Sequence, residues 1–124
     1  MSDMSVAVVI PAKNAEETLE KAFASVMKQK IAEPLEICIA VAPSEDRTLE
    51  IAKRIESENN NVTLVENPTG ETPVGLNLAI RNTKSRVVVR LDAHAELNEK
   101  YISKALEIMG QTGAVNVGGQ QKPV

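Results

Sequence analysis

Val87–His94, with the sequence VVVRLDAH, is the stretch on which the interpretation of this chain depends. The valines predict a buried strand, and the strand leads into a carboxylate, Asp92, and an imidazole, His94. Because alternate residues of a strand share a face, continued extension would place Arg90, Asp92 and His94 on the same side. Ligands of open α/β sheets bind at the carboxyl ends of the strands. We therefore expect Asp92 and His94 to hold a divalent metal or a polyhydroxy ligand.

Strand-like and helix-like segments alternate along the chain. Apolar runs predict strands at Val6–Ile10, Leu35–Val41, Val62–Val65, Arg86–Leu91 and Ala114–Val117. Apolar residues at helical spacing predict a helix after each of the first four strands. This order predicts an α/β fold, with a mainly parallel, Rossmann-like sheet that carries helices on both faces.

Capping residues indicate where the helices begin. Asn14 and Glu17 match the spacing of a capping box. Ser44 precedes the acidic first turn of the second helix, and Thr72 precedes a proline suited to a first helical turn. We expect Asn14, Ser44 and Thr72 to be the N-caps of their helices.

The last helix and the buried stripes complete this assignment. The last helix is expected at about Asn98–Met109, with Gly110 or Gly113 ending it. Each stripe of apolar residues is expected to face the core, including Met27, Ile80 and Met109.

Composition excludes several classes of protein. The 124 residues fit one domain, and one Phe, one Tyr and no Trp argue against stacking platforms for nucleic acid. A net charge of −3 with scattered Lys and Arg argues against binding to a phosphate backbone. Cys38, the only cysteine, is expected to be a buried small apolar residue. Without a signal-peptide pattern or a long apolar run, the chain is expected to be cytoplasmic. An unpaired sheet edge would favour self-association.

Three segments together resemble a known family, whereas G-x-G-x-x-G and Walker A motifs are missing after the first strand. The run VVIPAKNAE at residues 8–16 resembles the opening of family 2 glycosyltransferases with the A-type fold. Pro73–His94 resembles that family's second signature, in which an Asn-containing helix leads into a strand ending in Asp-x-Asp. The run TGAVNVGG at residues 112–119 is similar to succinoglycan-type exopolysaccharide glycosyltransferases, where His commonly takes the third position of the triplet.

The resemblance implies an enzyme that transfers a sugar from a nucleotide-diphosphate donor to a saccharide or lipid-linked acceptor. It implies donor contacts from Pro11, Ala12, Asn14, Asp46 and Asp92, and a divalent metal held by His94 and Asp92. Such a metal offsets the charge of the leaving diphosphate. It also implies that residues 1–124 form a nucleotide-diphospho-sugar-binding domain of a truncated A-type fold. The acceptor half and the general base would then lie beyond residue 124, and membrane association of the full-length protein is compatible with this.

Two positions depart from the family pattern. Ala42 stands where an Asp would bind the base, which leaves the base identity open. His94 replaces the second Asp of the triplet. Because Mg²⁺ prefers oxygen ligands and Mn²⁺ accepts imidazole, we expect Mn²⁺ to be favoured over Mg²⁺.

Structural roles compete with the functional ones at single residues. Asp92 is also suited to capping the next turn, and His94 to a hydrogen bond with a backbone carbonyl. Arg90 is expected to pair with a site carboxylate or touch diphosphate, Lys13 to approach phosphate or stay solvated, and Asn77 to reach the pocket or be exposed.

Two other classes of function stay open. One is a non-catalytic α/β ligand-binding or regulatory module, and the other is a nucleotidyltransferase. Nucleotidyltransferases normally carry a Gly-rich, basic loop after the first strand, which residues 11–16 do not provide.

Overall fold

The computed structural model describes residues 5–31, 35–85, 87–112 and 122–123. One sheet is formed by β1 (Val6–Ala12), β2 (Leu35–Val41), β3 (Val62–Glu66) and β4 (Val87–Arg90). The helices are α1 (Leu19–Met27), α2 (Thr48–Glu58), α3 (Thr72–Arg81) and α4 (Tyr101–Thr112). A short antiparallel pair is formed by β5 (Ala95–Glu96) and β6 (Lys122–Pro123). Within these ranges, no helix has the length and apolar character needed to cross a bilayer.

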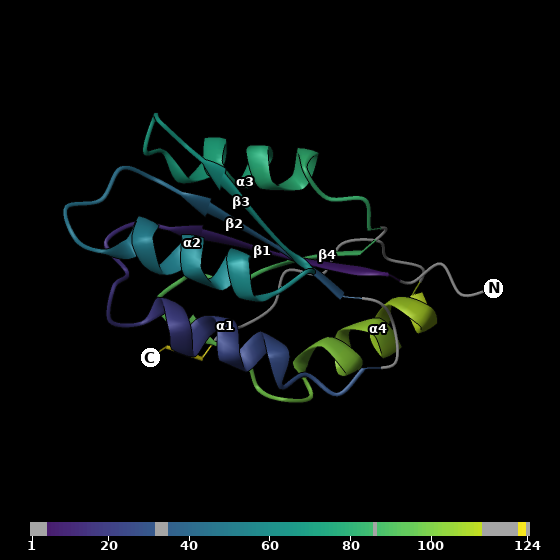
Figure 1. Cartoon of the computed structure of the whole chain (residues 1–124). Coiled ribbons are helices and arrows are strands. Elements are labelled where there is room, and N and C mark those ends of the chain that lie inside the picture. Colours follow the sequence, from purple (N-terminus) through teal and green to yellow (C-terminus); the bar gives the residue numbers. More distant parts are fainter. Residues whose placement is uncertain (1–4, 32–34, 86, 113–121, 124) are drawn as a thin grey trace.

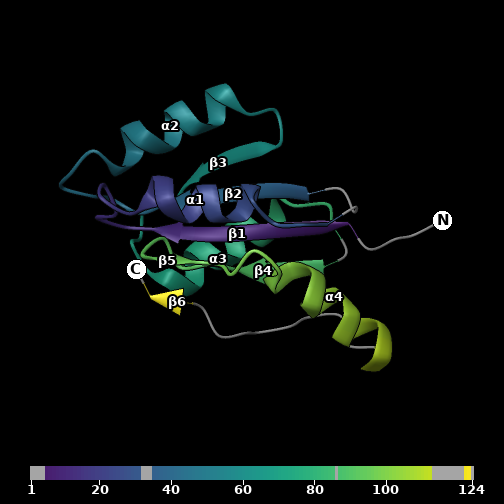
Figure 2. The same cartoon turned by 90° about the horizontal axis from the view of Figure 1, so that it is seen from below.

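The sheet is parallel throughout, in the order β3-β2-β1-β4 (Figure 1). From β1 the chain moves outward through β2 to β3, and β4 then returns to the other side of β1. Figure 2 shows α1 and α2 on one face of the sheet and α3 on the other. The expected α/β fold with a parallel sheet and helices on both faces is confirmed. The reversal of strand order creates a switch point between the carboxyl ends of β1 and β4.

The two faces of β1 enter two separate apolar clusters because strand residues alternate in direction. Val8 and Ile10 belong to the larger cluster, which includes buried residues of α1, α2 and α4. Val9 packs with Cys38 and with Ala79 of α3 in the smaller one. Cys38 is buried, as expected, and burial raises the pKa of its thiol to about 11.

Strand β1 continues two residues further than the sequence predicts. Pro11 lies within it, opposite Ala40 of β2. A proline lacks the amide that a central strand needs, but the pairing of β1 with β4 extends only to Val9 and Arg90. On the side facing β4, Pro11 therefore lies beyond the paired residues. Its missing amide removes no hydrogen bond between β1 and β4.

The predicted caps of the first two helices are wrong. Helix α1 begins at Leu19 with Thr18 in the capping position, and α2 begins at Thr48 after Arg47. Asn14 and Ser44 instead bond to each other's loops, a long-range use that local spacing does not reveal. Helix α3 includes Thr72, one residue earlier than expected.

Two of the expected core residues are exposed. Met27 is 47% exposed and Ile80 is 44% exposed. On α1 the buried face includes Ser25, whose hydroxyl accepts a hydrogen bond from the Leu97 amide (2.9 Å), so the buried stripe is rotated away from Met27. The spacing of apolar residues does not reveal a polar residue that is buried because it bonds a distant partner.

The end of the chain is only partly described. Helix α4 begins at Tyr101, later than the expected Asn98, and runs through Gly110 to Thr112. Gly110 therefore does not end it. Arg86, Gly113, the expected strand Ala114–Val117 and the side chain of Met109 lie outside the described residues.

Candidate functional site

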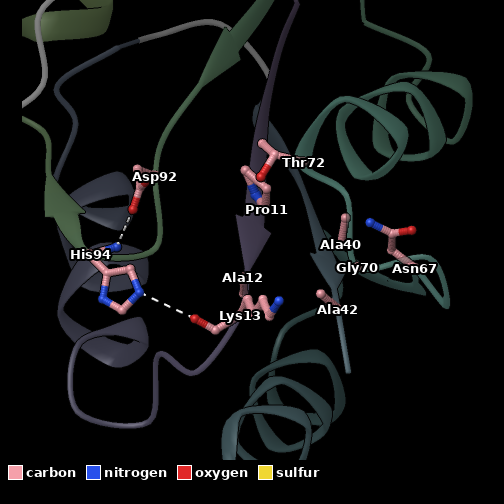
Figure 3. Close-up of a pocket in the computed structure, with 10 residues that line it drawn as sticks. All are labelled: Pro11, Ala12, Lys13, Ala40, Ala42, Asn67, Gly70, Thr72, Asp92 and His94. Atoms are coloured by element: carbon pink, nitrogen blue, oxygen red, sulfur yellow. Dashed lines mark hydrogen bonds between the residues drawn. The ribbon is translucent and has the colours of Figure 1, made fainter. Parts of the chain in front are cut away.

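A cavity of about 190 Å³ opens at the carboxyl edge of the sheet, at the switch point. Figure 3 shows Asp92 and His94 on one side, Gly70 and Asn67 on the other, and Lys13 between them. The residues that line it come from the ends of β1 and β2, from the segments that follow all four strands and from the start of α3, and are Pro11, Ala12, Lys13, Ala40, Ala42, Asn67, Gly70, Thr72, Asp92 and His94. Its volume is below the roughly 300–1,000 Å³ of a pocket for a drug-sized ligand, so it matches only part of a larger molecule.

Asp92 and His94 meet in this cavity, although the predicted route is wrong. Strand β4 ends at Arg90, and the Ala95 amide donates to the Asp92 carbonyl (3.0 Å), which closes a turn. The alternation of an extended strand therefore does not continue to His94. The Asp92 carboxylate accepts a hydrogen bond from the His94 amide (2.7 Å), so the competing capping role is also present.

The His94 ring contacts two groups of the segment that connects β1 to α1. Its Nδ1 lies 3.1 Å from the Thr18 hydroxyl, and its Nε2 lies 3.3 Å from the Lys13 carbonyl oxygen. The Thr18 hydroxyl is also 2.8 Å from the carbonyl oxygen of Ala93. The backbone-carbonyl contact expected as the alternative role of His94 is therefore observed.

The loops after β1 and β2 are joined by reciprocal hydrogen bonds. The Asn14 amide donates to Ser44 Oγ (3.0 Å), and the Glu45 amide donates to Asn14 Oδ1 (2.9 Å). Asn14 holds a left-handed backbone with φ of 47°, which asparagine tolerates better than most residues. Asn14 therefore shapes the loop that carries Lys13.

Asp46 strengthens the same junction. Its carboxylate accepts hydrogen bonds from the Glu16 amide (3.1 Å), the Thr48 amide (3.0 Å) and the Thr48 hydroxyl. The hydrogen bond from the Thr48 side chain, followed by those from the Thr48 and Glu16 amides, lowers the pKa of Asp46 because these donors favour the charged form. Asp46 thus bonds the first residue of α2, which begins at Thr48.

The predicted site residues therefore separate into two groups. Pro11, Ala12 and Asp92 line the cavity together with His94. Asn14 and Asp46 lie around a neighbouring polar hollow, which His94 also lines. His94 is the residue shared by the two.

A turn between β3 and α3 forms a wall of the cavity that the sequence did not assign to the site. Buried Asn67 donates to the Glu71 carbonyl (2.8 Å) and accepts from the Thr69 hydroxyl (2.8 Å). Gly70 holds φ of 74°, a left-handed conformation that glycine adopts at no steric cost. Gly75 lets α3 approach, since a Cβ there would lie 2.9 Å from Asn67 Nδ2. The Asn-Pro-Thr-Gly run of residues 67–70 is typical of a turn, but its position beside the cavity depends on the sheet order.

The opposite wall is held by Ser25 of α1 and by Gln29, which lies just past the end of α1. Besides the bond from Leu97 to Ser25, Gln29 donates to the carbonyl of Asn98 (2.6 Å) and accepts from the amide of Ile102 (2.9 Å). Ser25 and Gln29 thus fix the chain that follows the Asp92–Ala95 turn and satisfy an amide at the start of α4.

Three further side chains had open assignments. Lys13 reaches across the cavity, because a Cβ at Gly70 would lie 4.0 Å from Lys13 Nζ. Asn77 is exposed and does not line the cavity, in agreement with its structural alternative. Arg90 is also exposed and outside the cavity lining.

The donor set for a metal is small. Across the described part of the chain, His, Cys, Asp and Glu side chains nowhere gather in groups of three that would hold an ion. Asp92 and His94 supply one carboxylate and one imidazole. This set fits an ion that takes its remaining ligands from a bound phosphate and water, as ions in phosphate-transfer sites often do.

The chain belongs to glycosyl transferase family 2, whose family model matches residues 7–123. The fold and the resemblance expected from the sequence are both confirmed by this match and by the similar structures. The four-stranded parallel sheet is that of the A-type glycosyltransferases.

The chain is also similar to curated relatives and to a solved structure. The chain is 33% identical over 106 residues to the 4,4'-diaponeurosporenoate glycosyltransferase of Staphylococcus haemolyticus, covering 82% of this chain and 27% of the relative. It is 27% identical over 119 residues to the succinoglycan biosynthesis protein ExoA of Rhizobium meliloti, covering 94% and 36%. The chain thus spans about a third or less of these relatives. A mannosyltransferase from Pyrobaculum calidifontis, solved with GDP-Man and Mn²⁺, superposes with a TM-score of 0.72 and 25% identity, covering 84% of this chain and 32% of that one.

Proposed function

We propose that this chain forms the donor site of a glycosyltransferase that transfers a sugar from a nucleotide diphosphate with the help of a divalent metal. The observation that carries the proposal is the convergence of Asp92, His94 and Lys13 on one cavity at the switch point. Family membership and the mannosyltransferase solved with GDP-Man and Mn²⁺ support it.

Each residue of the cavity has a separate task in this proposal. Asp92 and His94 hold the metal, which supplies Lewis-acid stabilisation of the leaving diphosphate. Lys13 Nζ, near the Gly70 turn, adds a positive charge beside the same phosphates and so helps a chain of net charge −3 accept an anion. Pro11 and Ala12 provide the floor against which the nucleoside packs.

The Asn14–Asp46 hollow is assigned to the part of the donor that extends past His94. We assign no general base among the described residues, and place acceptor activation in the remainder of the longer enzyme. A cytoplasmic location and a saccharide or lipid-linked acceptor belong to the same proposal.

A thermal-shift panel tests the donor site. UDP, GDP and CDP are each added with and without Mn²⁺. A diphosphate present at 100 times its Kd should stabilise the fold by about 2.7 kcal/mol, a rise in Tm of about 10 °C. Asp92→Asn keeps an oxygen for the His94 amide but removes the charge, so it should lose the metal-dependent shift while folding normally.

The panel also separates the alternatives. No shift with any diphosphate and Mn²⁺ would favour a non-catalytic module, and a shift with nucleoside triphosphates alone would favour a nucleotidyltransferase. Because His94 supplies a nitrogen ligand, Mn²⁺ should give larger shifts than Mg²⁺ at equal concentration. Equal shifts with both metals would contradict the proposed ligand role of His94.

A further inference from the structure

Thr18, which directly precedes α1, contacts two residues of the Asp92–Ala95 turn. Its hydroxyl oxygen is 2.8 Å from the carbonyl oxygen of Ala93 and 3.1 Å from His94 Nδ1. The sequence gives this residue no role beyond its place near the helix start. The structure instead places its hydroxyl beside Nδ1 of the His94 ring.

The short distance between two oxygens fixes the position of a proton. A hydroxyl and a carbonyl oxygen at 2.8 Å attract each other only when the hydroxyl hydrogen lies between them. The Thr18 hydroxyl therefore donates to Ala93 and has only lone pairs left for His94. Nδ1 must then carry a hydrogen, because the contact at 3.1 Å needs a donor.

The other ring nitrogen faces a competing partner. His94 Nε2 is 3.3 Å from the Lys13 carbonyl oxygen, which accepts a hydrogen bond but cannot donate one. If the neutral ring carried its hydrogen on Nε2, that hydrogen would bond to Lys13 and the nitrogen would be lost as a metal ligand. The two tautomers of His94 thus correspond to an available and a blocked Nε2.

We propose that Thr18 is a positioning residue that holds His94 in the Nδ1–H tautomer and so keeps the Nε2 lone pair available for a cation. Metal-binding histidines generally depend on such a partner for the second ring nitrogen. The consequence for metal binding depends on the proposed function, whereas the tautomer is a property of the metal-free chain.

Nuclear magnetic resonance tests the tautomer directly, since His94 is the only histidine in the chain. Long-range ¹H–¹⁵N spectra of metal-free protein at alkaline pH distinguish a nitrogen that bears hydrogen from one with a lone pair. In the wild type, Nδ1 should bear the hydrogen. In Thr18→Val, the hydrogen should move largely to Nε2, the form that Lys13 stabilises and that free imidazole rings in histidine prefer in water.

Two control variants separate positioning from stability. Thr18→Ser retains the hydroxyl and should keep the Nδ1–H form. Thr83→Val removes a hydroxyl that also bonds a carbonyl, that of Ile80 (2.8 Å), but lies outside the cavity lining, and should leave the tautomer unchanged. A wild-type spectrum with the hydrogen on Nε2, or an unchanged spectrum in folded Thr18→Val, would overturn the proposal.

Calorimetric titration with Mn²⁺ in the presence of UDP or GDP provides a second readout. Thr18→Val should bind Mn²⁺ about tenfold more weakly, within the range found for partners of metal ligands. If Thr18→Val changes the tautomer but neither protein binds Mn²⁺, the metal site fails while the positioning role stands. If both bind Mn²⁺ equally well despite different tautomers, the consequence drawn for Thr18 is wrong.

Discussion

The two walls of the cavity are built in contrasting ways. The wall between β3 and α3 is held by hydrogen bonds within a few residues of Asn67, together with the close approach at Gly75. The wall after β4 is held by Thr18, Ser25 and Gln29, side chains that lie about 70 residues earlier in the sequence. One wall is therefore shaped locally, whereas the other depends on the docking of α1.

This contrast predicts that each wall fails in its own way when it is altered. Damage to the local wall should be expressed as steric misfit within the turn. Damage to the distant wall should be expressed as an unpaired amide and a loosened segment around Leu97. Two substitutions test these expectations, and a third tests the junction between the loops after β1 and β2. Their effects should decrease in the order given.

Gly75→Val should have the largest effect. A Cβ at this position would lie 2.9 Å from Asn67 Nδ2, and the buried amide cannot move away without losing its bond to Glu71. Overpacking of this kind should lower the free energy of unfolding by about 3 kcal/mol, as measured by denaturant unfolding. Asn77→Val adds the same side chain to an exposed position of α3 and is the control. Equal stability of the two variants would show that the turn adapts freely.

Ser25→Ala should have an intermediate effect. It leaves the Leu97 amide without its acceptor in a buried position, at a cost of about 2 kcal/mol. Hydrogen exchange should accelerate at Leu97 more than in the turn at Asn67. Ser57→Ala is the matched control. Ser57 is exposed, and its hydroxyl donates to the carbonyl of Arg54, three residues earlier (2.8 Å). Unchanged exchange at Leu97 would argue against anchoring by α1.

Asp46→Asn should have the smallest effect, and one that depends on pH. Because hydrogen bonds from Thr48 and Glu16 lower the pKa of Asp46 in the folded state, the charged form stabilises the fold above the ordinary value of 3.8. This contribution is lost as pH falls through the lower, folded-state pKa. The variant should be slightly less stable near neutral pH, and the difference should disappear in acid.

Chemical unfolding at several pH values measures this difference. Glu45→Gln, a change at the neighbouring exposed carboxylate, serves as the control. A stability gap between wild type and Asp46→Asn that persists at acid pH would mean that the carboxylate charge is not the source of the effect.

Local patterns in the sequence predicted much of the frame and part of the site. The apolar strands depend on short-range alternation and the Asn67–Gly70 turn on turn chemistry, whereas Asp92 and His94 meet through a turn that the expected alternation did not include. The Asn14 and Ser44 caps and the burial of Met27 were predicted incorrectly because the decisive partners lie in other loops. Hydrogen bonds between distant residues leave no periodic trace in a single sequence.

The same limit explains why Thr18 and Asn67 were missed as contributors to the site. Thr18 contacts Ala93 and His94 only after α1 packs beside the end of β4. Asn67 follows β3, and it reaches the cavity because the strand order β3-β2-β1-β4 brings the carboxyl ends of all four strands to one edge of the sheet. The roles of both residues follow from the strand order, which pattern alone does not specify.

The junction between the loops after β1 and β2 uses the main-chain amides of Glu45 and Arg47, and none of its bonds requires their exposed side chains. These two positions are therefore open to exchange without loosening the frame beneath them. Charge on either side of Asp46, which lines the neighbouring hollow, becomes adjustable independently of folding. Substitutions at these two positions can therefore change the surface charge of this region while the architecture that aligns His94 stays intact.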